Sequence, residues 1–298
     1  MPLAMWVALQ RSKLIMKYEK IDLKDEFPML LQSVELSLYI IDNSNEIDME
    51  RRRPMIVICP GGGYEMTSDR EAEPVAFKFI AAGYNVAVIK YSVAPIRYPN
   101  QLLQVSAAIA IVRRRSEEWN TDSEKIVVCG FSAGGHLAAS VGVLWQEEFI
   151  RDTLKLKHGE NKPNAMLLAY PVISGGEYAH RGSFDKLLGN AQTQEMVDYL
   201  SLENRVSPNT PPTFLWHTSD DNAVPCENSL MFAVALKRNN ISLELHIYRS
   251  GCHGLSLCSR DTAKDVAAGQ NNPLINSHIA TWFSLSVEWI EELFDGNC

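Results

Sequence analysis

Short apolar runs alternate along the chain with longer segments whose apolar residues recur every three or four positions. The short runs are rich in Val, Ile, Leu and Ala, which is typical of buried strands in a parallel sheet. They cover residues 54–59, 85–90, 125–129, 165–169, 211–217 and 243–248, and residues 33–41 alternate more loosely and predict an edge strand. The longer segments have helical periodicity and lie between Pro74 and Gly83, at about 100–119, and at 136–145, 227–238 and 279–293.

This alternation predicts an α/β fold, with a mostly parallel central sheet and helices on both of its faces. Residues 174–212 interrupt the alternation, because glycines are mixed there with a helical pattern over 194–206. We interpret this segment as a small cap over the site, with a plain surface excursion as the alternative.

Residues 127–136 have the pattern of a buried strand, a glycine-rich turn and the start of an apolar helix. Ser132 lies between Gly130 and Gly134 in a GxSxG pattern, which in this context is typical of a nucleophile elbow. The glycines are expected because any Cβ would crowd a sharp turn between strand and helix. A bare GxSxG also occurs in ordinary turns, but the flanking strand and helix favour Ser132 as a nucleophile.

Three consecutive glycines, Gly61 to Gly63, directly follow the buried run at 54–59. Glycines at this place let backbone amides turn towards a ligand, as in the oxyanion hole of an esterase. A phosphate loop is the alternative, but neither GK[ST] nor GxGxxG spacing is present. The amides of Gly62, Gly63 and Ala133 are therefore the candidate oxyanion donors.

Two further strands deliver ionisable side chains. Asp220 and Asp221 follow the strand at 211–217, and His253 follows the strand at 243–248. Serine, aspartate and histidine in this order, each just beyond a separate strand, is the arrangement of an α/β-hydrolase triad. The carboxyl ends of parallel strands meet at one edge of a sheet, so these side chains should lie together.

The segments that carry this arrangement resemble the α/β-hydrolase esterases, and most of all the bacterial acetyl esterase and acetylxylan-esterase-like sugar hydrolases. The resemblance rests on Pro-Gly-Gly-Gly-Tyr at 60–64, Gly-Phe-Ser-Ala-Gly-Gly-His at 130–136, His-Thr-Ser-Asp-Asp-Asn-Ala-Val-Pro at 217–225 and Cys-His-Gly at 252–254. It extends from about residue 33 to the final helix. Many hormone-sensitive-lipase-like esterases have histidine before the three glycines, whereas this chain has Cys59-Pro60, which fits the acetylxylan-esterase-like group better.

The resemblance implies a serine esterase in which Ser132 attacks an ester carbonyl, His253 transfers the proton and Asp221 orients the imidazole. It selects Asp221 because the acid of the family stands four residues before the proline; Asp220 is the alternative. No metal or cofactor is expected. The implied substrates are small-molecule acyl esters, above all acetyl groups on sugars or xylo-oligosaccharides. Feruloyl esterase, formamidase or peptidase activity, or ligand binding without catalysis, are the other readings of the same residues.

Other side chains near these motifs receive more ordinary interpretations. Tyr64 and Tyr170 are expected to line the substrate cleft, with core or rim aromatics as the alternative. His136 and His217 are expected to be satisfied packing residues. The charges at 67–74 are interpreted as a solvated helix entry. A zinc site at Cys252, His253 and Cys258 is disfavoured, since paired ligands at closer spacing are usual.

Length and charge narrow the picture further. The chain has 298 residues with a net charge of −8, so we expect one α/β-hydrolase domain over residues 16–298 and no nucleic-acid binding. Its six cysteines show no CxxC pair and indicate free thiols in a reducing compartment. Residues 3–9 are apolar but lack a preceding basic residue and are too short to cross a membrane. We therefore expect residues 1–15 to be an N-terminal extension of a cytoplasmic protein without membrane contact.

Overall fold

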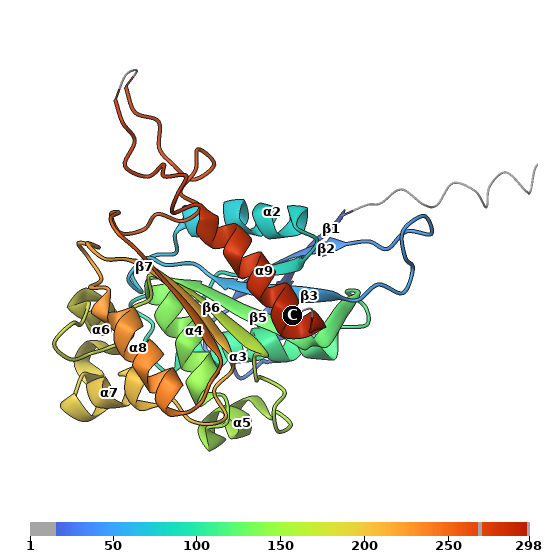
Figure 1. Ribbon diagram of the computed structural model, residues 1–298. Helices are drawn as coiled ribbons and strands as arrows, with labels where there is room; N and C mark the ends of the chain where they lie inside the picture. Colours follow the sequence, from blue (N-terminus) through green and yellow to red (C-terminus); the bar gives the residue numbers. More distant parts are fainter. Residues whose placement is uncertain (1–15, 268–269, 297–298) are drawn as a thin grey trace, which may run out of the picture.

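A single twisted sheet runs through the molecule in the computed structural model, which describes residues 16–267 and 270–296 (Figure 1). Its strand order is β1-β2-β4-β3-β5-β6-β7-β8. Both neighbours of β2 are antiparallel to it and the other neighbouring strands are parallel. The strands are β1 (Met16–Asp22), β2 (Glu35–Ile41), β3 (Arg53–Cys59), β4 (Asn85–Ile89), β5 (Thr121–Phe131), β6 (Ala165–Ala169), β7 (Thr213–Thr218) and β8 (Leu243–Tyr248).

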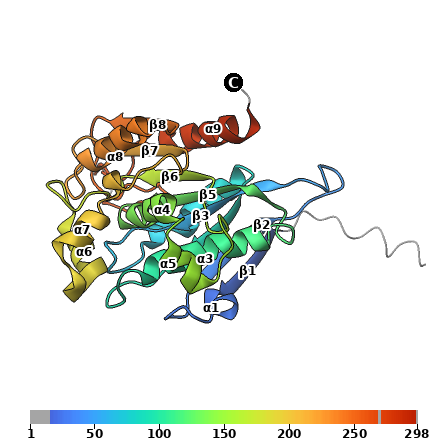
Figure 2. The same cartoon turned by 90° about the horizontal axis from the view of Figure 1, so that it is seen from below.

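Helices cover both faces of this sheet. One face carries α2 and α9, and the other carries α3, α4 and α8, as Figures 1 and 2 show from two directions. The helices are α1 (Leu23–Glu26), α2 (Glu73–Ala81), α3 (Asn100–Arg114), α4 (Ala133–Leu144), α5 (Glu148–Leu154), α6 (Arg181–Leu188), α7 (Gln194–Tyr199), α8 (Glu227–Arg238) and α9 (Thr281–Asp295). The predicted α/β-hydrolase fold is thus confirmed.

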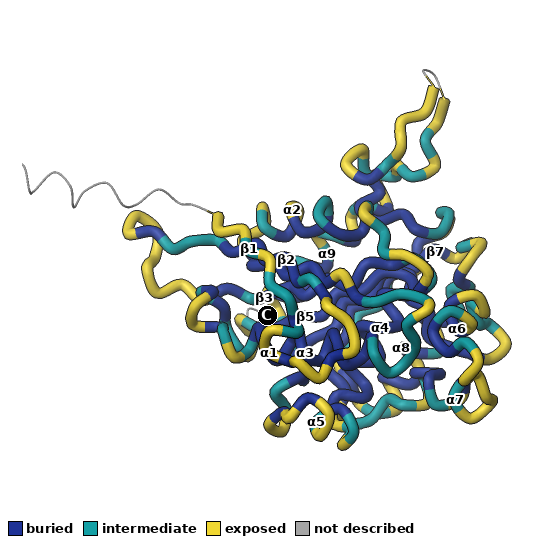
Figure 3. Tube along the Cα trace, turned by 180° about the vertical axis from the view of Figure 1, so that it is seen from behind, coloured by how far each residue is buried: buried dark blue, intermediate teal, exposed yellow. Residues whose placement is uncertain are grey.

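The strand β5 explains why the central runs are continuously apolar rather than alternating. Ile126 and Val128 join the core beneath α3 and α4, whereas Val127 and Cys129 join the core beneath α2 and α9. All four side chains are fully buried, and the middle of the sheet is dark blue in Figure 3. A strand that is covered on both faces has no exposed side for polar residues.

Several predicted boundaries differ from the structure. The strand β1 was not predicted because it is polar and exposed, yet it pairs along the whole of β2, which is therefore not the edge strand. The helix predicted to reach residue 119 ends at Arg114. The helical pattern at 194–206 ends at Tyr199, since the Ser201 hydroxyl donates to the Val197 carbonyl and accepts the Gly175 amide, and a short 3₁₀ turn follows.

The segment at 174–212 forms α6 and α7, which lie beside α4 and α8 (Figure 2). Phe184, Leu187 and Val197 are buried in the same core as α3 and α4. The segment is therefore anchored to the body by apolar packing. A second excursion, between β8 and α9, rises well above the sheet in Figure 1.

Among residues 16–267 and 270–296, no helix is both long and apolar enough to cross a membrane. The extension expected at residues 1–15 lies outside the described residues.

Candidate active site

Ser132 lies at the junction of β5 and α4 with a positive φ of 53°, a strained backbone conformation for a residue other than glycine. Two close backbone approaches surround it. A Cβ on Gly130 would lie 2.3 Å from the Gly134 carbonyl oxygen, and a Cβ on Gly134 would lie 2.1 Å from the Cys59 carbonyl oxygen. The predicted need for glycine at both positions is confirmed, and it brings the end of β3 against the start of α4.

The glycine loop, residues 60–66, passes over this junction. Gly62 and Gly63 have φ values of 126° and 65°, and the Gly62 carbonyl accepts hydrogen bonds from the amides of Glu65 and Met66. Within the described part of the chain, the amides of Gly62 and Gly63 themselves donate to no protein acceptor. Ala133 is the first residue of α4, where amides lack partners inside the helix. The three predicted oxyanion donors are therefore available to a ligand oxygen.

His253 connects the serine to a carboxylate. Its Nε2 lies 2.7 Å from Ser132 Oγ, and its Nδ1 lies 2.7 Å from Asp221 Oδ2. Asp220, the alternative carboxylate, turns the other way: it accepts from the Ser250 hydroxyl at 2.6 Å and from the Gly251 amide at 2.7 Å. The geometry therefore joins Ser132, His253 and Asp221 and leaves Asp220 as a turn-capping side chain.

The Asp221 carboxylate is almost fully buried and held on several sides. The amides of Ala223 and Val224 each donate to Oδ1 at 2.9 Å, and His217 Nε2 lies 3.3 Å from Oδ2. Burial alone would raise the pKa of Asp221, but the hydrogen bonds from His217 and His253 and the charge on His253 hold this pKa well below its ordinary value. Asp221 is thus kept ionised beside the His253 imidazole.

His217 does more than the packing role expected of it. Its side chain is fully buried, Nε2 lies 3.0 Å from the Val224 carbonyl, and Nδ1 lies 2.8 Å from the Ser229 hydroxyl. A carbonyl can only accept, so Nε2 carries the proton and also points it towards Asp221. His217 therefore packs in the core and helps to hold the carboxylate that orients His253.

The expectation for Tyr64 is wrong. Only 1% of Tyr64 is exposed, and its hydroxyl lies 2.9 Å from Nδ1 of His136, whose Nε2 lies 2.9 Å from the Leu200 carbonyl. Full burial lowers the pKa of His136 to about 4. Tyr64 and His136 therefore form a buried polar pair that ties the glycine loop and α4 to the segment at 174–212, and His136 is the satisfied packing residue that was predicted.

The expectation for Tyr170 is also wrong, and so is the solvated interpretation of Glu71. Tyr170 is 2% exposed, and its hydroxyl donates to Glu71 Oε1 at 2.7 Å and accepts the Ser256 amide at 2.9 Å. Glu71 is 3% exposed, and its Oε2 accepts the Gly61 amide at 2.9 Å. The Tyr170 ring meets the His253 ring edge to face, with centroids 5.1 Å apart. The Glu71–Tyr170 pair lies beside His253, and no sequence pattern indicated it, because the local charges resemble those of an exposed helix start.

Ser132 and His253 open into a cleft of about 310 Å³. Its other lining residues are Gly62, Gly63, Met66, Ser68, Arg70, Glu71, His180 and Gly254. His180 comes from the segment at 174–212 and was not predicted, since a single histidine before a helix carries no distinctive signal. The segment thus contributes His180 to the lining of the cleft.

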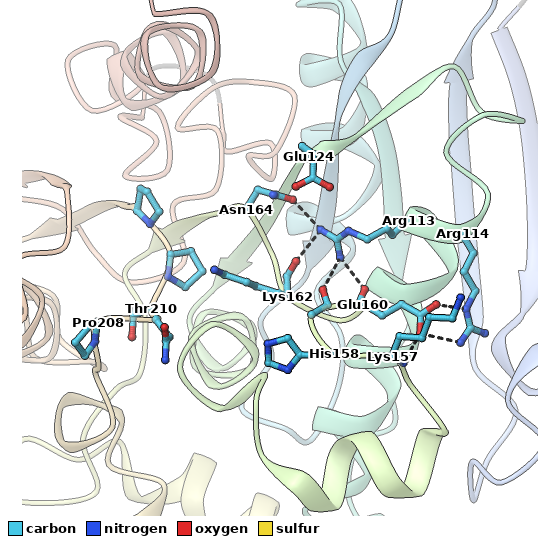
Figure 4. Close-up of a pocket in the computed structure, with 14 residues that line it drawn as sticks. Arg113, Arg114, Glu124, Lys157, His158, Glu160, Lys162, Asn164, Pro208 and Thr210 are labelled. Carbon is cyan, nitrogen blue, oxygen red and sulfur yellow. Dashed lines mark hydrogen bonds and ion pairs between the residues drawn. The ribbon is translucent and has the colours of Figure 1, made fainter.

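A larger pocket, of about 630 Å³, lies near the starts of β6 and β7, at the opposite edge of the sheet from Ser132 (Figure 4). Arg113 spans it and donates to the backbone carbonyls of Ser123, Glu160 and Lys162 and to the Asn164 side chain. Its guanidinium is thus occupied in joining loops. In the described residues no group of three metal-binding side chains occurs, at Cys252 and Cys258 or elsewhere.

This fold, with a serine elbow, a glycine loop and an aspartate-histidine pair at the carboxyl edge of the sheet, defines an α/β hydrolase. Comparison with known proteins identifies the family. Residues 44–236 match the BD-FAE family, and the chain belongs to that family.

Two curated relatives share part of the chain. One is endo-1,4-beta-xylanase B of Butyrivibrio fibrisolvens, 34% identical over 74% of this chain and 35% of the relative. The other is an acetylxylan esterase of Xylanibacter ruminicola, 30% identical over 67% of this chain and 40% of the relative. The chain therefore spans less than half the length of these relatives.

Solved structures match over nearly their whole length. The acetyl ester-xyloside bifunctional hydrolase of Caldicellulosiruptor lactoaceticus is 36% identical, with a TM-score of 0.78 over 95% of this chain and 98% of that one. The carboxylesterase Cest-2923 of Lactobacillus plantarum is 26% identical, with a TM-score of 0.79 over 94% and 98%. The predicted resemblance to acetylxylan-esterase-like hydrolases is confirmed.

Proposed function

We propose that this chain is a serine carboxylesterase that removes short acyl groups, with Ser132 as nucleophile, His253 as general acid and base, and Asp221 as the orienting carboxylate. The observation that carries the proposal is the relay of two 2.7 Å contacts from Ser132 through His253 to Asp221. The Ser132 end of this relay lies in the cleft, together with Gly62 and Gly63, whose amides donate to no acceptor within the described residues.

The reaction follows from this arrangement in two stages. His253 Nε2 takes the proton of Ser132 as Oγ bonds to the ester carbonyl carbon, and the carbonyl oxygen becomes an oxyanion facing the amides of Gly62, Gly63 and Ala133. Each such donor is worth roughly 2.7–4 kcal/mol of transition-state stabilisation. His253 returns the proton to the departing alcohol. It then takes a proton from a water that attacks the acyl-enzyme. As the bond between the acyl carbon and Ser132 Oγ breaks, His253 returns this proton to Oγ and the carboxylic acid is released.

For the substrate, we propose acetyl esters of sugars or xylo-oligosaccharides. The names of two relatives, an acetylxylan esterase and an acetyl ester-xyloside hydrolase, support this class. The cleft volume of about 310 Å³ supports a small acyl ester, and Ser68, Arg70 and His180 place polar groups in its lining.

Steady-state hydrolysis tests both the proposed mechanism and the proposed substrate class. Wild type and Ser132→Ala are compared on p-nitrophenyl acetate and octanoate, on acetylated xylo-oligosaccharides and on methyl ferulate. We expect wild type to release acetate from both acetyl substrates and Ser132→Ala to be inactive and unlabelled by a fluorophosphonate. Turnover of p-nitrophenyl acetate alone would refute the sugar assignment, and undiminished activity of Ser132→Ala would refute the mechanism.

A further inference from the structure

His180 reaches the cleft from the start of α6 and lines it together with Ser132 and His253. It is half-buried and precedes the first residue of the helix. It is thus a side chain of the 174–212 segment that faces the reacting groups.

The hydrogen bonds of His180 fix which nitrogen carries the proton. The Ser183 amide donates to Nδ1 of His180, and the Ser183 hydroxyl lies 2.8 Å from the same atom. An amide N–H can only donate, so Nδ1 is an acceptor and the proton of the neutral ring resides on Nε2. Burial also lowers the pKa of His180, which favours this neutral form. The helix cap therefore leaves His180 with an N–H group on its far side.

This N–H group is available within the cleft. Among the described residues, Nε2 of His180 makes no hydrogen bond, and it is not one of the buried polar atoms that lack a partner. It is therefore exposed, on a residue that lines the cleft. A donor that is fixed by a helix cap and lacks a protein acceptor is suited to an oxygen of the substrate.

The position of His180 favours a contact with the alcohol portion of the ester over a contact with the acyl portion. In the proposed mechanism, the oxyanion faces Gly62 and Ala133, whereas the departing alcohol must face His253, which returns the proton. His180 and His253 line the same cleft, and, after burial, the proximity of His253 is a cause of the lowered pKa of His180. These observations relate His180 to the leaving group.

We propose that His180 is a specificity-determining residue, whose Nε2–H donates to a hydroxyl or ring oxygen of a polyhydroxylated alcohol portion such as a sugar. This inference rests on the proposed esterase function. It predicts that an acetylated sugar is preferred over an acetate of a plain alkyl alcohol, since both share the acyl group and only the first offers a hydroxyl or ring oxygen.

The test compares two acetates with the same acyl group, an O-acetylated methyl xyloside and ethyl acetate, each followed by titration of the released acid. His180→Asn is the informative variant, because asparagine is a strong helix N-cap and can keep the Ser183 contact, but its shorter side chain does not reach the position of Nε2. His180→Phe keeps the bulk of the ring and removes both nitrogens. Thermal unfolding of each variant reports the effect on folding.

In both variants we expect the ratio of kcat/KM for the xyloside over kcat/KM for ethyl acetate to fall about 3- to 10-fold, as for one lost neutral hydrogen bond. We expect His180→Phe alone to lower the Tm. An unchanged ratio in His180→Asn, or an equal loss on both esters, would overturn the inference while the esterase function stands. Wild type that hydrolyses neither ester would overturn the function itself, and the inference with it.

Discussion

The carboxyl group of Glu71 and the hydroxyl of Tyr170 share a hydrogen bond of 2.7 Å behind the imidazole of His253. On one side, Glu71 holds the amide of Gly61 at the base of the glycine loop. On the other side, Tyr170 holds the amide of Ser256, three residues after His253. One buried pair therefore joins the two loops that carry the proposed oxyanion donors and the proposed general base.

Breaking this pair should slow the reaction more than it weakens binding. In Glu71→Gln, the amide group presents a donor where Gly61 or Tyr170 needs an acceptor, and in Tyr170→Phe the shared hydrogen bond is absent. We expect kcat to fall roughly tenfold in each variant with little change in KM, because misplaced groups act on the transition state. Steady-state kinetics on p-nitrophenyl acetate measure both constants.

The double variant and a control separate positioning from general damage. Since both changes remove the same contact, Glu71→Gln with Tyr170→Phe should cost about as much as the larger single change. Tyr248→Phe removes another buried tyrosine contact, 3.1 Å to Thr281 at the start of α9 rather than to the glycine loop or the His253 loop, and should lower stability without lowering kcat. If the loss of kcat in the double variant equalled the product of the two single losses, Glu71 and Tyr170 would act separately.

The two adjacent aspartates should differ sharply in their effects on turnover. Asp221→Asn removes the charge that balances a positive His253, and we expect kcat to fall by about 10³–10⁴-fold, the scale for an orienting aspartate in a serine hydrolase. Asp220→Asn can accept the Gly251 amide through its amide oxygen and donate its amide N–H to the Ser250 hydroxyl, so kcat should stay within about twofold. Rates on p-nitrophenyl acetate at pH 7–8 measure both. Comparable losses would mean that the triad has been assigned to the wrong carboxylate.

The residues that the sequence located share one property: their positions follow from local pattern. Ser132 follows a buried strand and is flanked by glycines, Asp221 follows a second buried strand, and His253 follows a half-buried strand with alternating apolar residues. Apolar runs identify such strands, and parallel strands bring their carboxyl ends together. The fold and the proposed triad could therefore be predicted from the sequence.

The residues that the sequence misplaced depend on contacts between distant segments. Tyr170 was expected in the cleft, but Glu71, which is 99 residues earlier in the chain, binds its hydroxyl in the core. Glu71 itself stands among charged neighbours in a turn, so its burial has no local signature. His180 also has no local sequence signature, since it becomes a cleft residue only because α6 packs beside α4.

Gly134 should tolerate no side chain. A Cβ there would lie 2.1 Å from the Cys59 carbonyl oxygen and 2.3 Å from that of Pro60, and these backbone atoms cannot move without displacing the glycine loop. We expect Gly134→Ala to destabilise the fold by about 1–3 kcal/mol, the usual cost of overpacking, and to reduce kcat as well. Urea unfolding measures the stability change.

Gly182 is the matched control, because a Cβ there would meet nothing closer than 3.6 Å and the residue lies within α6. Alanine is favoured over glycine in helices by about 1 kcal/mol, so Gly182→Ala should be neutral or stabilising. If both alanine variants unfolded at the wild-type urea concentration, the close contact at Gly134 would be disproved.

His136 should make the stability of the protein depend on mildly acidic pH. Its pKa is about 4 in the folded chain, where burial beside Tyr64 and Phe184 favours the neutral ring, against about 6.5 in an unfolded chain. Between these values the unfolded chain binds more protons than the folded chain does. The free energy of unfolding should therefore fall as the pH is lowered from about 6.5 to 4, by about 3 kcal/mol across the whole window.

Urea unfolding at intervals from pH 7 to 4.5 isolates this contribution when wild type is compared with His136→Gln. The variant lacks the titrating ring, so it should be less stable than wild type at pH 7 and should lose less stability on acidification. The exposed His278 provides the control, since His278→Gln should follow the wild-type pH dependence. Parallel curves for wild type and His136→Gln would mean that His136 titrates alike in the folded and unfolded chains, and that its burial does not hold it neutral.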